Sequence, residues 1–129
     1  MANSINHYLA PFPMRGSGQA IVAAGCSYGI DPRLIVGIAG AETTFGAGSH
    51  PSLNVWGNGP GAYMGPTWWQ AARQEARNLR RIYFDQGLST VWQIAPKYLG
   101  HSDYAGWGSR VSRVLGDLGG SPNYLRVRC

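Results

Sequence analysis

Residues 28–46 read YGIDPRLIVGIAGAETTFG, and this stretch predicts one apolar helix with a clear start and a clear end. Asp31 followed by Pro32 is typical of a helix start, because a carboxylate caps the first free N–H groups and proline fits the first turn. The helix is expected to run to about Phe45 and to stop at Gly46. Its apolar residues recur at helical spacing, so one side of the helix is expected to be buried.

Glu42 lies on the apolar side of this expected helix. Ile35, Ile38 and Phe45 fall within roughly 60° of it, at about 100° per residue. No basic residue stands three or four positions away, so the carboxylate has no local ion partner. Burial of an unpaired carboxyl raises its pKa, which is the condition for a general acid near neutral pH. The alternative is a helix-end glutamate that reaches solvent past its small neighbours.

The chain on either side of this stretch predicts further helices. Most of them start at a capping residue, and several end at a glycine. The ranges are 17–28, capped by Ser17 and ended by Gly29; 67–86, capped by Thr67 and ended by Gly87; 90–99, capped by Ser89 and interrupted by Pro96; and about 104–118. No run of alternating apolar and polar residues is long enough to predict a strand.

Residues 46–66 are rich in glycine and proline, which argues against a long helix or a regular pair of strands. A loop of about 20 residues is unusual inside a compact domain unless it has a function. The predicted class is therefore mainly α, with this Gly-rich loop or a small hairpin as an insertion. Residues 1–15 are expected to form an irregular lead-in, residues 16–120 the domain, and residues 121–129 a tail or the start of a linker.

The composition limits the classes of function. The 129 residues fit one domain, and no stretch is long and apolar enough for stable insertion in a membrane. The net charge is +5 and ten of the eleven basic residues are arginine. Such a charge attracts nucleic acid, anionic lipid or the acidic polymers of the bacterial wall, although solubility alone also explains it. The first residues lack a basic segment followed by an apolar one, so no secretory signal is expected.

No metal and no cofactor are expected, because no cysteine and histidine cluster has the spacing of zinc ligands. Cys26 lies in an apolar helical run and is interpreted as a buried thiol. A disulfide between Cys26 and Cys129 is the less favoured alternative.

Two segments of the chain resemble a known family. Residues 28–46 are similar to the active-site helix of the lysozyme-like superfamily of peptidoglycan glycosidases, where an apolar helix leads to Glu, a small hydroxyl pair, an aromatic residue and Gly. LNVWGN (53–58) is similar to the Asn-x-aromatic-Gly segment of endo-β-N-acetylglucosaminidase and lytic-transglycosylase relatives. The resemblance covers about residues 18–118 and extends to the lysozyme-like domains of phage endolysins, including those aimed at mycobacteria. The Gly-Leu-Met-Gln motif of many transglycosylases is absent, since residues 61–66 read GAYMGP.

The resemblance implies helices packed around a groove, with Glu42 as the general acid at the end of a buried helix. Thr43 or Thr44 stands where the family often has Ser, near the acid or the N-acetyl group of the substrate. The residues that shape the groove wall are then Asn54, Trp56 and Gly57.

The activity that the resemblance implies is hydrolysis of a β-1,4 bond between N-acetylmuramic acid and N-acetylglucosamine in peptidoglycan. A monomer would act on the bacterial wall. It would be made in the host cytoplasm and released by a phage holin, or carried within a larger endolysin.

The second catalytic group is not obvious from the sequence. Glycosidases usually pair two carboxylates, yet the next acid after Glu42 is Glu75, on an arginine-rich helix, where it is interpreted as a surface residue. Three alternatives remain: a water activated by Asn54 or a tyrosine, the substrate's own N-acetyl group, or Asp103 folded into the groove. The first two need a single carboxylate and are preferred. The candidate tyrosines are Tyr63 and Tyr98.

Aromatic side chains offer flat apolar surfaces on which sugar rings stack. Trp56 and Tyr63, in the Gly-rich loop, are the preferred candidates. Trp68 or Trp69 must turn partly outward, since neighbouring helical residues diverge by about 100°. The indoles interpreted as core residues are Trp92 and Trp107.

Three other functions stay open. A non-catalytic wall-binding module explains the tryptophans and the charge, but not a lone glutamate on an apolar face. A lytic transglycosylase would form 1,6-anhydro ends. A helical nucleic-acid-binding domain is suggested by the arginines of residues 73–81, but Glu75 interrupts that run and no nucleic-acid-binding motif is present, so nucleic acid is not an expected partner.

Overall fold

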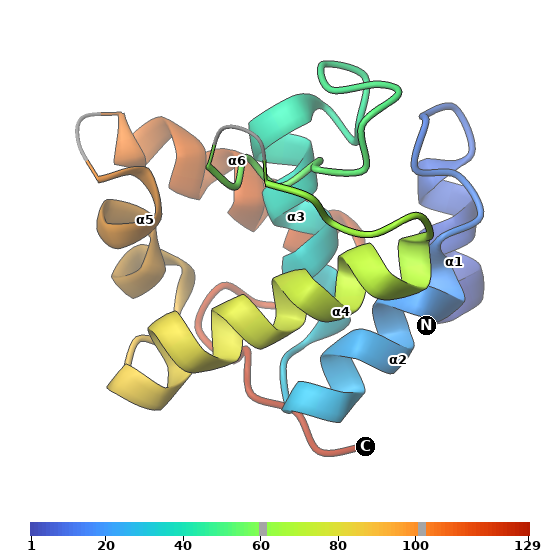
Figure 1. Cartoon of the computed structure of the whole chain (residues 1–129). Helices are drawn as coiled ribbons and strands as arrows, with labels where there is room; N and C mark the ends of the chain where they lie inside the picture. Colours follow the sequence, from blue (N-terminus) through green and yellow to red (C-terminus); the bar gives the residue numbers. More distant parts are fainter. Residues whose placement is uncertain (60–61, 101–102) are drawn as a thin grey trace.

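The computed structural model describes residues 1–59, 62–100 and 103–129, and helices dominate them (Figure 1). The elements in chain order are α1 (Ala2–Leu9), α2 (Gly18–Tyr28), α3 (Pro32–Thr43), α4 (Trp68–Asn78), η1 (Leu79–Tyr83), η2 (Phe84–Gln86), α5 (Val91–Leu99) and α6 (Tyr104–Asp117). No strand forms within these residues, and an isolated antiparallel bridge joins Ile30 to Arg126. The predicted mainly α class is confirmed.

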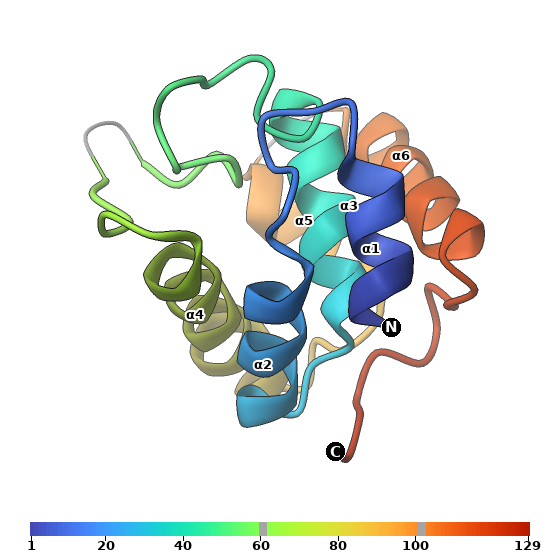
Figure 2. The ribbon, with the colours of Figure 1, turned by 90° about the vertical axis from the view of Figure 1, so that its right-hand side faces the viewer.

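Helix α3 lies in the middle of the molecule, with the other helices arranged around it (Figures 1 and 2). Helices α2 and α6 pack directly on α3, α4 packs on α2, and α5 packs on α6. Every residue of α3 from Leu34 to Ala39 is buried. Gly37 permits the close approach of α6, because a Cβ there would stand 3.1 Å from the carbonyl oxygen of Val111. None of the described helices is both long and apolar enough to cross a membrane.

The start of α3 is as predicted. The Asp31 side chain accepts a hydrogen bond of 3.0 Å from the backbone N–H of Arg33 and pairs with its guanidinium at 2.9 Å. The end comes two residues before the predicted one, at Thr43, because Thr44 adopts a left-handed conformation with φ of 51°. Phe45 then folds back so closely that a Cβ at Gly40 would stand 2.6 Å from its ring.

The expectation of an irregular lead-in was wrong for residues 2–9, which form α1. Ile5 and Leu9, one helical turn apart, are fully buried and fasten this helix to the core. Asn6 accepts a hydrogen bond of 2.7 Å from the N–H of Gly18 at the start of α2. Short helices have weak sequence signals because tertiary contacts supply most of their stability.

Residues 121–129 pack against the body of the fold. Leu125 is buried, and its carbonyl accepts a hydrogen bond of 2.8 Å from the backbone N–H of Asp31. Cys129 forms a disulfide with Cys26. The interpretation of Cys26 as a free buried thiol was therefore wrong. The bond ties this segment to the last turns of α2, so the segment is held to the domain.

The predicted helix over residues 67–86 changes its geometry partway. It begins as expected after Thr67, whose side chain accepts from the Gln70 N–H, and it ends before Gly87. Between these points lies a π turn, η1, followed by a 3-10 turn, η2. The Lys97 ammonium reaches across from α5 and donates a hydrogen bond of 2.9 Å to the carbonyl of Ile82 in the π turn.

Helix α5 is capped by Thr90 rather than by the predicted Ser89. The Thr90 side chain accepts from the Gln93 N–H, and the Gln93 side chain accepts from the Thr90 N–H, which makes a complete capping box. Residues 46–59 and 62–66, the described part of the Gly-rich segment, contain no strand, so the segment is a loop and not a hairpin.

Candidate active site

Glu42 stands on the last turn of α3 and is partly buried. Its Oε2 accepts a hydrogen bond of 2.7 Å from the indole Nε1 of Trp107 on α6. Burial raises the pKa of Glu42 above its ordinary value, and the Trp107 bond and the positive charge of Arg110 offset part of that rise. The direction is the one expected from the place of Glu42 on the apolar side of α3.

Gly57 brings the Gly-rich loop against this carboxyl. Its φ is +68°, and a Cβ built on it would overlap Oε1 of Glu42. Glycine is required here for two separate reasons, since L residues rarely adopt this φ and no side chain fits. Gly57 is itself exposed, so Oε1 of the acid lies beside loop backbone that reaches the surface.

Asn54 shapes the loop from within. Its Nδ2 donates to the Asn58 carbonyl at 2.9 Å, and its Oδ1 accepts from the Asn58 N–H at 3.1 Å. Both ends of the amide are thus used to close the turn that carries Gly57. Asn54 therefore positions the loop, and because both ends of its amide are occupied, the structure does not favour the alternative in which it activates water.

The predictions for the tryptophans were partly wrong. Trp56 is fully buried, with its Nε1 donating to the Ile35 carbonyl at 2.9 Å, so it is not a stacking surface for a sugar. Trp92 is 45% exposed and is not a core residue. Trp107 is buried as expected, but its direct bond to Glu42 was not foreseen.

Glu75 was missed by the sequence analysis, which placed it on the surface. The side chain is completely buried, and its Oε1 accepts a hydrogen bond of 3.1 Å from Nδ2 of Asn58. A signal was present in the sequence, because Ala71 and Leu79 lie four residues to either side of it and are also buried. The neighbouring arginines obscured that signal.

The two short contacts of the Tyr98 hydroxyl favour a neutral Glu75. Oη of Tyr98 lies 2.6 Å from the carbonyl oxygen of Trp56 and 2.9 Å from Oε2 of Glu75. A phenol has one proton and can donate to only one of these acceptors. When Tyr98 donates to Trp56, a protonated Glu75 can donate to Oη, and both short contacts are then satisfied.

The electrostatics point the same way. Burial raises the pKa of Glu75 to about 7, against the lowering effect of the hydrogen bonds that Asn58 and Tyr98 can donate to its ionised form. The negative charge of Glu42 adds to the rise. Burial, and then the charge of Glu75, hold the pKa of Tyr98 well above its ordinary value. Two carboxyl groups with raised pKa therefore occupy one region of the molecule.

Tyr98 joins the two carboxyl groups through stacked rings. It stacks on Trp107 with ring centroids 5.1 Å apart and on Tyr83 with centroids 5.6 Å apart. A continuous set of contacts thus runs from Glu75 through Tyr98 and Trp107 to Glu42. Tyr98 was expected to meet the substrate, but its hydroxyl instead faces two groups of the protein.

The other predicted site residues differ in their exposure and contacts. Thr44 is exposed at the end of α3, whereas the Thr43 hydroxyl donates to the Val55 carbonyl at 2.8 Å and holds the loop. Trp68 is partly buried against Trp56, with ring centroids 6.4 Å apart. Tyr63 is 75% exposed and lines a hollow of about 350 Å³ formed by the Gly-rich loop. It is the predicted aromatic residue best placed to meet a ligand.

Asp103, the acid named as the third alternative for a second catalytic group, lies near Arg110 on α6. It is exposed at the start of α6, and its carboxylate lies 3.8 Å from the guanidinium of Arg110. Among the residues that the structure describes, no group of three or more His, Cys, Asp or Glu side chains is placed to hold a metal ion.

No family model matches the chain, and neither a curated protein nor a solved structure matches it.

Proposed function

We propose that this chain hydrolyses a β-1,4 bond between N-acetylmuramic acid and N-acetylglucosamine in peptidoglycan, with Glu42 as the general acid. The observation that carries the proposal is the state of the Glu42 carboxyl. It has a raised pKa, is held through Oε2 by Trp107, and lies beside the backbone of an exposed glycine loop through Oε1. This combination suits proton donation to an extended polymer at the surface.

The arrangement divides the work between the two oxygens of Glu42. Oε2 accepts from Trp107, which leaves Oε1 as the oxygen that carries and donates the proton. As the glycosidic C–O bond breaks, that proton passes to the leaving sugar oxygen and Glu42 becomes a carboxylate. The Trp107 N–H then stabilises the new charge without moving, since it already points at the group.

Glu75 is not proposed as the second catalytic carboxyl. It is fully buried, and its oxygens face Asn58 and Tyr98. The oxocarbenium-like centre is instead met by water or by the N-acetyl group of the substrate, as the single-carboxylate alternatives require. We propose that Glu75 positions Tyr98 and the loop, and that its proton keeps a second negative charge away from Glu42.

The test is release of muropeptides from purified bacterial wall by the wild-type chain and by Glu42→Gln. Loss of a general acid is expected to lower the rate by about 10²-fold or more. Asp85→Asn is the matched control, because Asp85 is an exposed acid paired only with Arg80. Unchanged release by Glu42→Gln would contradict the enzyme proposal and favour a non-catalytic wall-binding module.

Mass spectrometry of the products distinguishes the remaining alternatives. The reducing-end sugar identifies the bond that is cut, and 1,6-anhydro ends would indicate a lytic transglycosylase. Action on the wall by a monomer, after release from a host cytoplasm by a phage holin or within a larger endolysin, is part of the same proposal.

A further inference from the structure

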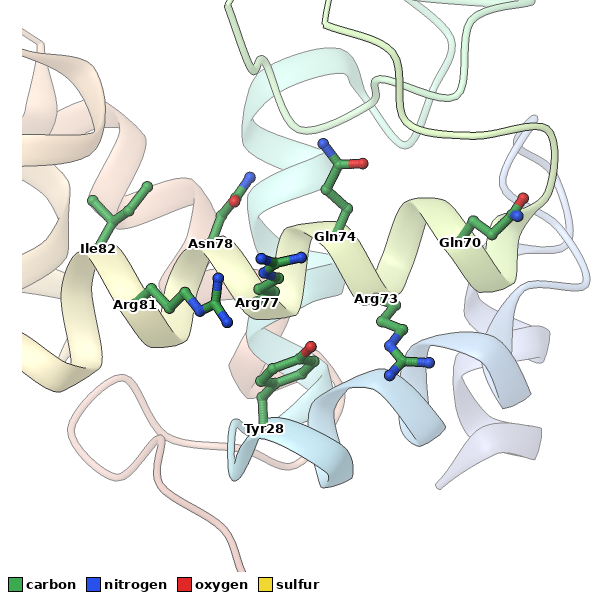
Figure 3. A pocket seen from close by; sticks show the side chains of 8 residues that line it. All are labelled: Tyr28, Gln70, Arg73, Gln74, Arg77, Asn78, Arg81 and Ile82. Carbon is green, nitrogen blue, oxygen red and sulfur yellow. The ribbon is translucent and has the colours of Figure 1, made fainter.

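A large basic hollow lies between α4 and α2, and the candidate active site does not use it. It has a volume of about 710 Å³, and Arg73, Arg77 and Arg81 line it together with Tyr28 of α2. Figure 3 shows the three arginines along one stretch of the helix, with Arg73 extending toward α2 and the Tyr28 ring below Arg77. We call this feature the arginine hollow.

The charges in the arginine hollow are not neutralised by the protein. Among residues 1–59, 62–100 and 103–129, none of the three guanidinium groups lies within ion-pair distance of a carboxylate. Arg80, one position away, behaves differently and pairs with Asp85 at 2.7 Å. Glu75, the acid within the run, points into the core. The carboxyl that interrupts the basic sequence therefore does not reduce the charge of this face.

The spacing of the arginines suits a linear polyanion. Positions 73, 77 and 81 recur every four residues, which corresponds to steps of about 6 Å along a helix. A polymer with one phosphate per short repeat can present its charges at similar intervals. Trp69 is 55% exposed and lines, with Arg73, a second hollow of about 290 Å³, so the track continues toward the start of α4.

We propose that the arginine hollow binds the acidic, phosphodiester-linked polymers that are attached to bacterial walls. The choice of this polymer rests on the proposed function, which places the chain at the wall. Single-stranded nucleic acid is less well suited, because successive bases stack on neighbouring aromatic rings, whereas Trp69 lies in the adjoining hollow and Tyr28 is only partly exposed. A flat bilayer surface does not follow a hollow between two helices.

Glu75 and the arginines lie on nearly opposite sides of α4, since two residues correspond to about 200° of rotation. Polymer binding and glycan cleavage are therefore expected to be separable by mutation. Arg73→Gln/Arg77→Gln/Arg81→Gln removes the charges of the hollow. Arg15→Gln/Arg113→Gln/Arg128→Gln is the matched control, because it removes equal charge from exposed arginines elsewhere.

The experiment measures binding of poly(glycerol phosphate) at several salt concentrations, with Glu42→Gln in every protein so that no glycan is cut. The hollow variant is expected to bind roughly tenfold more weakly or worse, and its slope of log K against log salt is expected to fall by about 2. The control variant is expected to stay within about threefold of the parent, since it changes only the long-range field.

Equal losses in the two variants would overturn the proposal, because net charge would then explain the binding. Tighter binding of single-stranded DNA or of anionic lipid vesicles than of poly(glycerol phosphate), lost in the hollow variant, would also overturn it. Failure of the proposed function is recognised separately, as unchanged muropeptide release by Glu42→Gln in a chain that keeps all its arginines.

Discussion

The indole Nε1 of Trp107 donates a hydrogen bond of 2.7 Å to Oε2 of Glu42, although 65 positions separate the two residues in the sequence. The bond joins the ends of two helices that pack against each other, α3 and α6. It fixes one oxygen of the acid and lowers its pKa relative to burial alone.

Trp107→Phe is expected to shift the pH profile of wall cleavage. A general acid is active while it holds its proton, so activity falls as the pH rises through its pKa. Removing the Trp107 donor raises the pKa of Glu42 further, and the alkaline limb of kcat/KM should move to higher pH. Trp92→Phe is the control, since Trp92 is exposed. An unmoved limb in Trp107→Phe would show that the bond does not tune the acid.

Glu75 is expected to make the fold less stable as the pH rises. Its pKa is about 7 in the folded chain, against an ordinary value of 4.5. Between these values the unfolded chain loses the proton while the folded chain keeps it, so the free energy of unfolding falls. Above pH 7 the loss from this group is complete and amounts to roughly 3 kcal/mol.

Glu75→Gln provides the measurement, because an amide keeps an oxygen for Asn58 and an N–H for Oη of Tyr98. Urea unfolding at pH 5 and pH 8 should show a smaller difference in the variant than in the wild type. Parallel behaviour of the two proteins would mean that Glu75 is already ionised in the folded state at pH 5.

Gly57→Ala is expected to reduce wall cleavage strongly, because the new Cβ would displace Oε1 of Glu42 and the φ of +68° is unfavourable for alanine. The backbone strain alone should cost about 1–2 kcal/mol of stability. Gly59→Ala is the matched control in the same loop, since nothing lies within 4 Å of its Cβ position. Comparable rates for the two variants would argue against contact between this loop and the reacting acid.

Cys26→Ser/Cys129→Ser is expected to destabilise the fold while sparing the acid. The disulfide joins residues 103 positions apart, and loss of such a crosslink should lower the free energy of unfolding by about 2–5 kcal/mol. Denaturant unfolding of the variant, compared with the wild type under oxidising conditions, measures this. At temperatures and denaturant concentrations where the variant is still folded, muropeptide release should persist. Loss of muropeptide release by the folded variant would contradict the prediction.

The sequence predicted what depends on neighbouring residues. The Asp31 and Thr67 caps, the helix ends at Gly29 and Gly87 and the described part of the loop at residues 46–66 all follow from local backbone chemistry, and they are found where expected. The raised pKa of Glu42 also follows, because helical spacing alone placed it among apolar residues. The sequence-based predictions failed where segments distant in the sequence come into contact.

Contacts across the fold could not be predicted in this way. Trp56 was expected in a groove wall because it lies in a loop, but its indole finds a carbonyl of α3 and is buried. Glu75 was assigned to the surface because charged neighbours dominate its segment, although its helical phase matches buried residues. In both cases the sequence indicates the local position of a side chain, but not which distant segment packs over it.

The π turn at Leu79–Tyr83 makes this segment one residue longer than a regular α-helix would need. Inserting one more residue there, where the π turn already holds an extra one, would rotate the chain beyond by about 100° if α geometry continued. Tyr83 would then leave its place against Tyr98, and Lys97 would lose the Ile82 carbonyl. Insertions in these five positions should therefore be tolerated less well than substitutions, because the residue count itself sets the register of the rings behind Glu42.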